Sequence, residues 1–102
     1  MSKDLHISAL LDVYGAFLGA KQREITEHYY NDDLSLAEIA ENEGITRQGV
    51  RDRIKRAEQT LISLERECRY CERFKRLKEL ASRLSGGDTG VVKEITDIIE
   101  EL

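Results

Sequence analysis

Proline and tryptophan are absent from this 102-residue sequence, and cysteine occurs only twice. No run of apolar residues approaches the about 20 that a bilayer crossing requires, and no basic segment followed by an apolar block opens the chain. We therefore expect neither an export signal nor a membrane anchor. In the reducing compartment that remains, a structural disulfide is not expected. The sequence predicts a cytoplasmic protein.

The composition that remains favours amphipathic helices. Charged residues make up 35% of the chain, and the apolar residues fall in short, spaced groups. No segment has the pattern of a strand. A chain of this length has room for one compact domain. We predict an all-α fold that forms a single helical domain over residues 1–102.

Basic residues are concentrated in one part of an acidic chain. The formal net charge is -4, yet residues 46–83 contain 12 Lys or Arg against 6 Asp or Glu, a net of +6, so that the remainder carries -10. Affinity for nucleic acid depends on local positive charge that displaces counterions from phosphate. The asymmetry therefore suggests an anionic partner for the basic segment. A solvated basic helix face is the alternative interpretation.

Two helices are expected before the basic segment. Apolar residues between Asp4 and Leu18 recur at intervals of three and four, which places them on one face of a first helix. The residues of this face are Leu10, Leu11, Tyr14, Phe17 and Leu18. Gly19 follows and can close the helix in the left-handed conformation. A second helix is predicted from about Lys21 to Tyr30.

A helix-turn-helix pattern follows these two helices. Ser35 and Glu38 have the spacing of a capping box, which marks the start of a third helix. Gly44 permits a tight turn, and Thr46 is a suitable N-cap for a fourth helix. Ala40 is the small residue needed where the two helices touch, and the residues expected to fill the wedge between them are Ile39, Ile45, Val50 and Ile54. We predict a helix-turn-helix core over residues 20–62, whose second helix can enter a major groove.

The side of the fourth helix opposite Val50 and Ile54 provides the candidate contacts. The candidate nucleic-acid-binding residues are Arg47, Gln48, Arg51, Asp52, Arg53, Lys55 and Arg56. Arginine and glutamine can form paired hydrogen bonds with guanine and adenine edges, whereas Lys55 and Arg56 are better placed for phosphate. Asp52 would repel phosphate, although it can accept a hydrogen bond from cytosine. A solvated face and a protein-docking role remain alternative interpretations.

The apolar spacing becomes that of a heptad repeat within the fourth helix. The positions concerned are Ile54, Ala57, Leu61, Leu64, Cys68 and Cys71. Such a seam predicts a long recognition and connecting helix with a partner helix, either from the same chain or from a second subunit, and we expect a homodimer. A shift in phase predicts a bend between residues 71 and 74. Gly86-Gly87 then separates the two helices of a C-terminal hairpin in the extension at 63–102, the second of them capped by Asp88 or Thr89.

The remaining motifs do not indicate an enzyme. Cys68 and Cys71 match C-x-x-C, but zinc usually takes four ligands and the chain has no second pair. Core packing is favoured over metal binding or a redox role, because both cysteines fall on the heptad seam. No Ser, Asp or Cys has the spacing that would place His28 in a catalytic relay. We expect no catalytic residue, no metal and no cofactor.

Several segments resemble known regulatory proteins. Residues 19–24, 29–30, 33–40 and 50–57 resemble region 4 of sigma factors, which recognises the -35 promoter element. Nothing in the chain resembles the sigma region that melts the -10 element, so an autonomous sigma factor is not expected. Residues 11–14, 20–23, 29–41 and 46–50 are similar to the YlxM family of small Gram-positive proteins. This second similarity spans nearly the whole chain.

The resemblance to the YlxM family implies a role. The family is encoded beside the genes of the signal recognition particle, which implies a regulatory function in that targeting pathway. Our leading hypothesis is a non-enzymatic, dimeric helix-turn-helix protein that binds DNA or the signal recognition particle RNA. The alternative is an interaction module that uses the same fold to dock a targeting or transcription component.

Overall fold

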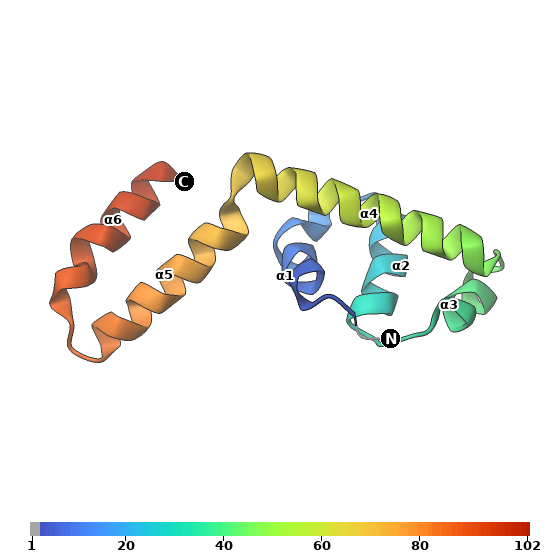
Figure 1. Cartoon of the computed structure of the whole chain (residues 1–102), viewed down its shortest axis with the longest axis horizontal. Helices are drawn as coiled ribbons and strands as arrows, with labels where there is room; N and C mark the ends of the chain where they lie inside the picture. Colours follow the sequence, from blue (N-terminus) through green and yellow to red (C-terminus); the bar gives the residue numbers. More distant parts are fainter. Residues whose placement is uncertain (1–2) are drawn as a thin grey trace. The chain divides into compact units, whose positions relative to one another are not determined.

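The computed structural model describes residues 3–102, and all regular structure in this range is helical (Figure 1). The α-helices are α1 (Leu5–Tyr14), α2 (Ala20–Tyr30), α3 (Leu36–Glu43), α4 (Arg47–Cys68), α5 (Tyr70–Ser85) and α6 (Val92–Glu101). Two 3-10 turns, η1 (Gly15–Phe17) and η2 (Thr89–Val91), complete the order. The all-α prediction is confirmed. None of the helices in this range has the length and apolar content that a bilayer crossing requires.

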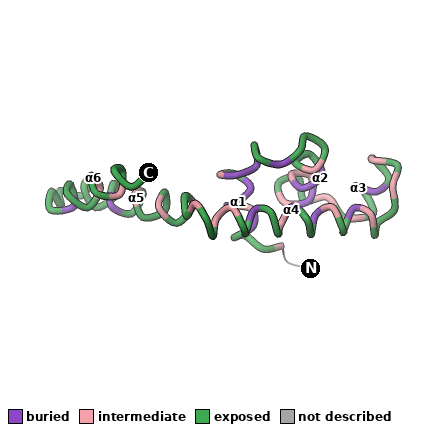
Figure 2. The backbone as a smooth tube through the Cα atoms, turned by 90° about the horizontal axis from the view of Figure 1, so that it is seen from above, coloured by how far each residue is buried: buried purple, intermediate pink, exposed green. Residues whose placement is uncertain are grey.

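The chain divides into two compact units. The first ends at Glu67 and the second runs from Cys68 to Leu102, and each is described by itself. Figure 2 shows that buried positions are concentrated in the first unit, whereas Leu80 is the buried residue of α5 and α6 has none. The organisation as a single domain stays a prediction.

The first helix is shorter than the spacing predicted. It ends at Tyr14, and the 3-10 turn η1 follows. A 3-10 helix has three residues per turn, so it rotates the following side chains relative to an α-helix. Phe17, which we expected on the inner face, is therefore 71% exposed, whereas Leu18 is buried. Gly19 also differs from expectation, because it has φ -59 and ψ 149 and begins α2 instead of closing α1 in the left-handed conformation.

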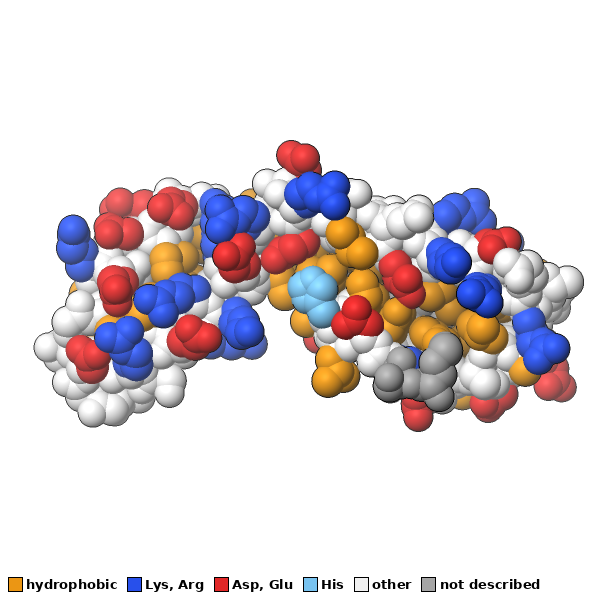
Figure 3. All heavy atoms as spheres, in the orientation of Figure 1, with side chains coloured by type: hydrophobic (Ala, Val, Ile, Leu, Met, Phe, Trp, Pro, Cys, Tyr) orange, Lys and Arg blue, Asp and Glu red, His pale blue; other side chains and the backbone are white. Residues whose placement is uncertain are grey.

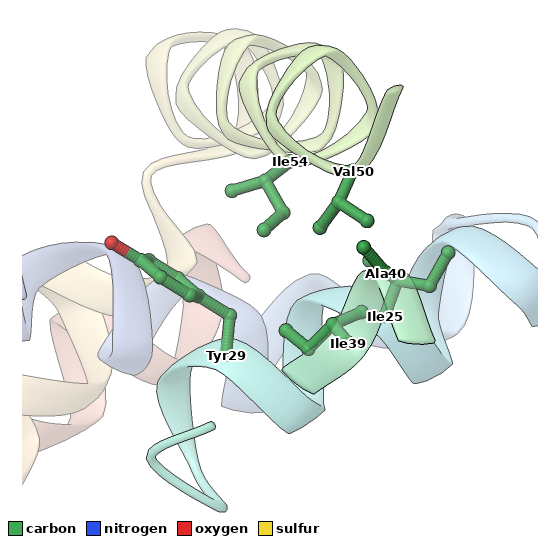
Figure 4. Packing of buried hydrophobic residues seen from close by; sticks show 6 residues of the cluster. All are labelled: Ile25, Tyr29, Ile39, Ala40, Val50 and Ile54. Carbon is green, nitrogen blue, oxygen red and sulfur yellow. The ribbon is translucent and has the colours of Figure 1, made fainter. Parts of the chain in front are cut away.

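Helices α2, α3 and α4 share one hydrophobic core. Its buried residues are Ile25 and Tyr29 from α2, Ile39 and Ala40 from α3, and Val50 and Ile54 from α4. Figure 4 shows the α4 side chains pointing toward those of the other two helices. Ile25, Ile39 and Val50 have no exposed surface. This packing fixes the rotation of α4 about its own axis.

The turn between α3 and α4 has the predicted chemistry. Gly44 has φ 67 and ψ 32, the left-handed conformation, and its amide donates to carbonyls in the last turn of α3. The Thr46 hydroxyl accepts from the Gly49 amide at 3.0 Å, as expected of an N-cap. At the other end of α3 the capping box is complete, with Ser35 accepting from the Glu38 amide and Glu38 accepting from the Ser35 amide. The helix-turn-helix is confirmed.

Two tyrosines attach the long helix α4 to the rest of the first unit. The Tyr14 hydroxyl donates to Glu65 Oε1 at 2.6 Å, and the Tyr30 hydroxyl donates to Glu58 Oε1 at 2.5 Å. Leu61 lies between these anchors along α4 and is fully buried. The first part of the heptad seam is therefore covered within the chain itself.

The heptad seam does not continue through one helix. Helix α4 ends at Cys68, and Arg69, with φ 56, interrupts it before α5 begins at Tyr70. The break lies just before the predicted bend at residues 71–74, so Cys71 belongs to the next helix. A left-handed residue ends an α-helix whatever the apolar spacing around it, which is why the periodicity placed the break too late. Both cysteines are half-buried and form no disulfide.

The second unit is a helical hairpin, as predicted. Helix α5 ends at Gly86-Gly87, where Gly87 has φ 96, and the Asp88 side chain accepts from the Gly90 amide at 3.1 Å. Asp88 therefore caps the 3-10 turn η2, whereas α6 begins after Val91 without a side-chain cap, so the prediction that Asp88 or Thr89 caps this helix is wrong. Leu80 and Val91 are the fully buried apolar residues of this unit among those described.

Candidate nucleic-acid interface

The start of α4 presents polar and basic side chains beside the start of α3. A shallow groove is lined by Ser35, Leu36, Ala37, Arg47, Gln48 and Arg51. Arg47, Gln48 and Arg51 are exposed because Val50 occupies the buried side of the same helical turn. The groove thus combines the amino-terminal end of α3, whose first amides lack helical acceptors, with two arginines.

A second hollow continues from this groove along α4. Arg51 and Lys55 line it together with Leu36 and Glu58. Glu58 accepts the hydroxyl of Tyr30, which keeps its carboxylate against α2. Burial and this hydrogen bond raise the pKa of Tyr30, so the phenol stays protonated as a donor. Arg51 lies at the junction of the two hollows, and Lys55 lies one helical turn further along.

Gln48 and Asp52 form a pair on the exposed side of α4. The Gln48 amide nitrogen donates to Asp52 Oδ1 at 2.9 Å. This bond restricts the amide of Gln48 and leaves its oxygen and second N–H available to another partner. The i, i+4 spacing of the two residues in the sequence is a recognised signal for such a bond.

The seven predicted contact residues do not share one surface. Arg53 is half-buried. Arg56 lines a different hollow together with Gln22 of α2 and Gln59. The groove beside α3 instead contains three residues that were not among the predicted contacts, namely Ser35, Leu36 and Ala37. The capping box gave the signal for them, because it marks the helix end that lies beside α4.

The basic side chains at this end of the first unit come from α4, whereas α3 carries three glutamates and no Lys or Arg. Figure 3 shows Lys and Arg side chains along the beginning of α4, with hydrophobic side chains between them and acidic side chains nearby. Within residues 3–102, Arg47, Arg51 and Lys55 form no ion pair, so their charges are available to an anion.

One cluster has the residue types of a metal site. Ligand atoms of Glu24, His28 and Glu43 all lie within 4.8 Å of one another. Lys21 occupies this position, with its Nζ 2.8 Å from Glu24 and 3.1 Å from Glu43. These hydrogen bonds raise the pKa of Lys21 and lower the pKa of Glu24. The ammonium group supplies the positive charge, and the cluster joins α2 to the end of α3.

The capped α3, the left-handed turn at Gly44 and the exposed basic start of α4 together define a helix-turn-helix protein. A sequence profile of the family described as "Putative helix-turn-helix protein, YlxM / p13 like" matches residues 1–101. The chain belongs to this family, which confirms the resemblance stated above.

Relatives in several bacteria match most of the chain. A UPF0122 protein of Desulforamulus reducens is 42% identical over 97 residues, which cover 90% of this chain and 83% of the relative. A UPF0122 protein of a Geobacillus species is 36% identical over 105 residues, which cover 100% of this chain and 96% of the relative. A UPF0122 protein of a Thermoanaerobacter species is 40% identical over 103 residues, which cover 96% of this chain and 88% of the relative.

Proposed function

We propose that this protein is a cytoplasmic regulator that binds nucleic acid through the groove between the starts of α3 and α4. The observation that carries the proposal is the exposure of Arg47, Arg51 and Lys55 on the side of α4 opposite its buried apolar residues. Membership of a helix-turn-helix family supports the same function. The implied association of the family with the signal recognition particle makes regulation of that pathway our proposed role.

Helix α4 would make different contacts with duplex DNA and with RNA. The major groove of B-form DNA admits an α-helix, whereas that of an RNA duplex is too narrow for side chains to reach the bases. Insertion of α4 into a groove would therefore indicate duplex DNA. Binding to the signal recognition particle RNA would use phosphate contacts and unpaired bases. Both ligands belong in the test.

A gel-shift assay across a salt series tests the proposal. The probes are a promoter duplex and the signal recognition particle RNA. We expect affinity for one of them to fall steeply with salt, because phosphate contacts release counterions. Lys55→Ala should reduce the slope of log binding constant against log salt concentration by about 1. Arg51→Ala should weaken binding by roughly tenfold or more. Lys93→Ala in α6 removes the same charge elsewhere and should leave binding unchanged.

Two further outcomes separate this proposal from protein docking. Absence of salt-dependent binding to either probe would overturn nucleic-acid recognition. If a protein partner then co-purifies after nuclease treatment, the helix-turn-helix serves as a docking module. Circular dichroism of each variant shows whether the helices remain formed, so that lost binding is not confused with unfolding.

Asp52 provides a test of sequence recognition within the same assay. Asp52→Asn removes the negative charge but keeps an oxygen that can accept from Gln48, so binding to all sequences should strengthen. Asp52→Ala also removes that acceptor and frees the amide of Gln48. We expect only the alanine variant to reduce the difference in affinity between sequences with and without adenine at the contacted position. Equal discrimination by both variants would refute the positioning role of Asp52.

A further inference from the structure

The hairpin of the second unit leaves much of its apolar surface uncovered. Helix α6 contains no buried residue, and its Val92 and Ile99 are 51% and 56% exposed. Phe74 and Leu84 of α5 are also exposed, although Leu80 of the same helix is fully buried. Figure 3 shows hydrophobic side chains between α5 and α6, with acidic and basic side chains on either side. The hairpin thus buries Leu80 and leaves open apolar edges that contain Phe74 of α5 and Val92 and Ile99 of α6.

An isolated hairpin of this size lacks a sufficient core. Chains below about 40 residues usually need a metal, a disulfide or association to hold a fold. The second unit begins at Cys68, its cysteines are not bonded to each other, and its fully buried apolar residues are few. An exposed apolar face on such a unit is typical of an interaction surface.

The two helices of the hairpin carry opposite charges. Helix α5 has five basic and two acidic residues, a net of +3, and α6 has one basic and four acidic residues, a net of -3. Within the hairpin, Glu94 forms ion pairs with two arginines of α5. Its Oε1 lies 3.8 Å from Arg76 Nη2, and its Oε2 lies 3.9 Å from Arg83 Nη1. Among residues 3–102, Lys78 of α5 and Glu100 of α6 form no ion pair.

These unpaired charges flank the open apolar edges. Lys78 follows Phe74 by four residues, so the two lie near the same side of α5. Glu100 follows Val92 by eight residues, so these two lie near the same side of α6. An acidic or a basic partner would match only one of the two flanks. A second copy of the same hairpin, turned by a two-fold rotation, presents its acidic helix to α5 and its basic helix to α6.

We propose that the α5–α6 hairpin is a self-association surface, which pairs with the hairpin of a second copy to form a four-helix bundle. Helix α5 of one copy packs against α6 of the other, so Phe74 and Ile99 of each copy enter the shared core. Lys78 lies opposite Glu100 of the second copy at the rim, as flanking charges do in coiled coils. This surface is independent of the proposed nucleic-acid interface.

Sedimentation equilibrium from about 1 to 100 µM tests the proposal. The chain has a mass of 11.7 kDa, and we expect twice this mass at the upper concentrations. Ile99→Asp places a charge in the shared core and should yield the monomer. Phe17→Asp is the matched control, because Phe17 is equally an exposed apolar residue but lies in η1 of the first unit. Its mass should equal that of the wild type.

Charge reversal guards against a variant that merely unfolds the hairpin. Lys78→Glu and Glu100→Lys each create like-charge contacts across the two-fold axis, so each should weaken self-association by about tenfold at low salt. The double variant restores the opposite charges and should return within about threefold of the wild type. An equimolar mixture of the two single variants should form heterodimers.

Three results would overturn this inference. They are a wild-type protein that remains at 11.7 kDa at 100 µM, an Ile99→Asp variant that still dimerises, and a double variant no better than the single variants. A monomeric wild type that binds another protein through this face would assign the surface to that partner instead. Nucleic-acid binding by the monomer would leave the proposed function intact, so the two proposals fail separately.

Discussion

Replacing Gly44 with alanine tests the turn that orients α4. Gly44 has φ 67, and a Cβ atom built there would meet no atom within 4 Å. The cost of the substitution is therefore conformational and not steric. A residue other than glycine pays about 1–2 kcal/mol in the left-handed region. The lower entropy of the unfolded alanine chain offsets roughly 0.4–1 kcal/mol of this. We expect a net loss of about 1 kcal/mol.

Urea unfolding followed by circular dichroism at constant protein concentration measures this loss. Gly19→Ala is the matched control, since a Cβ atom at Gly19 also meets nothing within 4 Å but φ is -59, which any residue adopts. Its free energy of unfolding should lie within about 0.5 kcal/mol of the wild type, because a poorer N-cap opposes the entropic gain. Equal effects of the two substitutions would refute the assignment of the left-handed turn to Gly44 alone.

Three further substitutions test the supports of the helix-turn-helix. Ser35→Ala removes the oxygen that accepts the Glu38 amide, and urea unfolding should show a loss of about 1 kcal/mol. Ile39→Ala opens the core behind α4 and should cost roughly 2–5 kcal/mol in the same assay, with a cooperative transition retained. Lys21→Ala should raise the pKa of Glu24 in a carbon NMR titration, because Lys21 lowers that pKa now. Because the pKa of Glu24 is lowered in the folded protein, the stability that this pair contributes is present above the usual carboxyl pKa. It is lost as pH falls through the lowered pKa. An unchanged pKa of Glu24 in the Lys21→Ala variant would contradict the ion pair.

Local signals in the sequence predicted the helix-turn-helix well. The capping box at Ser35, the left-handed turn at Gly44 and the cap at Thr46 each depend on residues within a few positions of one another. The buried side of α4 followed from the spacing of Val50 and Ile54, because one long helix keeps a constant phase. These elements orient the candidate interface, so its main features were accessible without a structure.

Features that depend on a change of phase were either missed or placed a few residues too late. The 3-10 turn η1 rotates Phe17 out of the core, and nothing in the apolar spacing indicates it. Arg69 adopts the left-handed conformation although arginine has no preference for it, so the end of α4 carries no local signal. Gly19 precedes a helix as its cap instead of following one. Glycine alone does not distinguish these two positions.

The exposed side of α4 was predicted from the sequence, but the division of its residues between different surfaces was not. A helical wheel separates the buried side of α4 from the exposed side, but it does not show which neighbouring helix borders each edge. Arg47 and Arg51 face the groove at α3, whereas Arg56 lies beside α2. The hairpin presents the same difficulty, since the spacing marks Phe74 and Ile99 as apolar without showing that their partner helix leaves them uncovered.

Chemical-shift mapping by NMR shows which amides contact nucleic acid, and so whether the starts of α3 and α4 form the interface. The labelled protein is titrated with whichever probe binds in the gel-shift assay. We predict that the largest changes fall on the amides of residues 35–37 and 47–55, and that amides of residues 70–101 keep their positions apart from uniform broadening. Changes confined to the α5–α6 hairpin, or to the side of α4 that carries Arg53 and Arg56, would show that nucleic acid does not bind at the starts of α3 and α4.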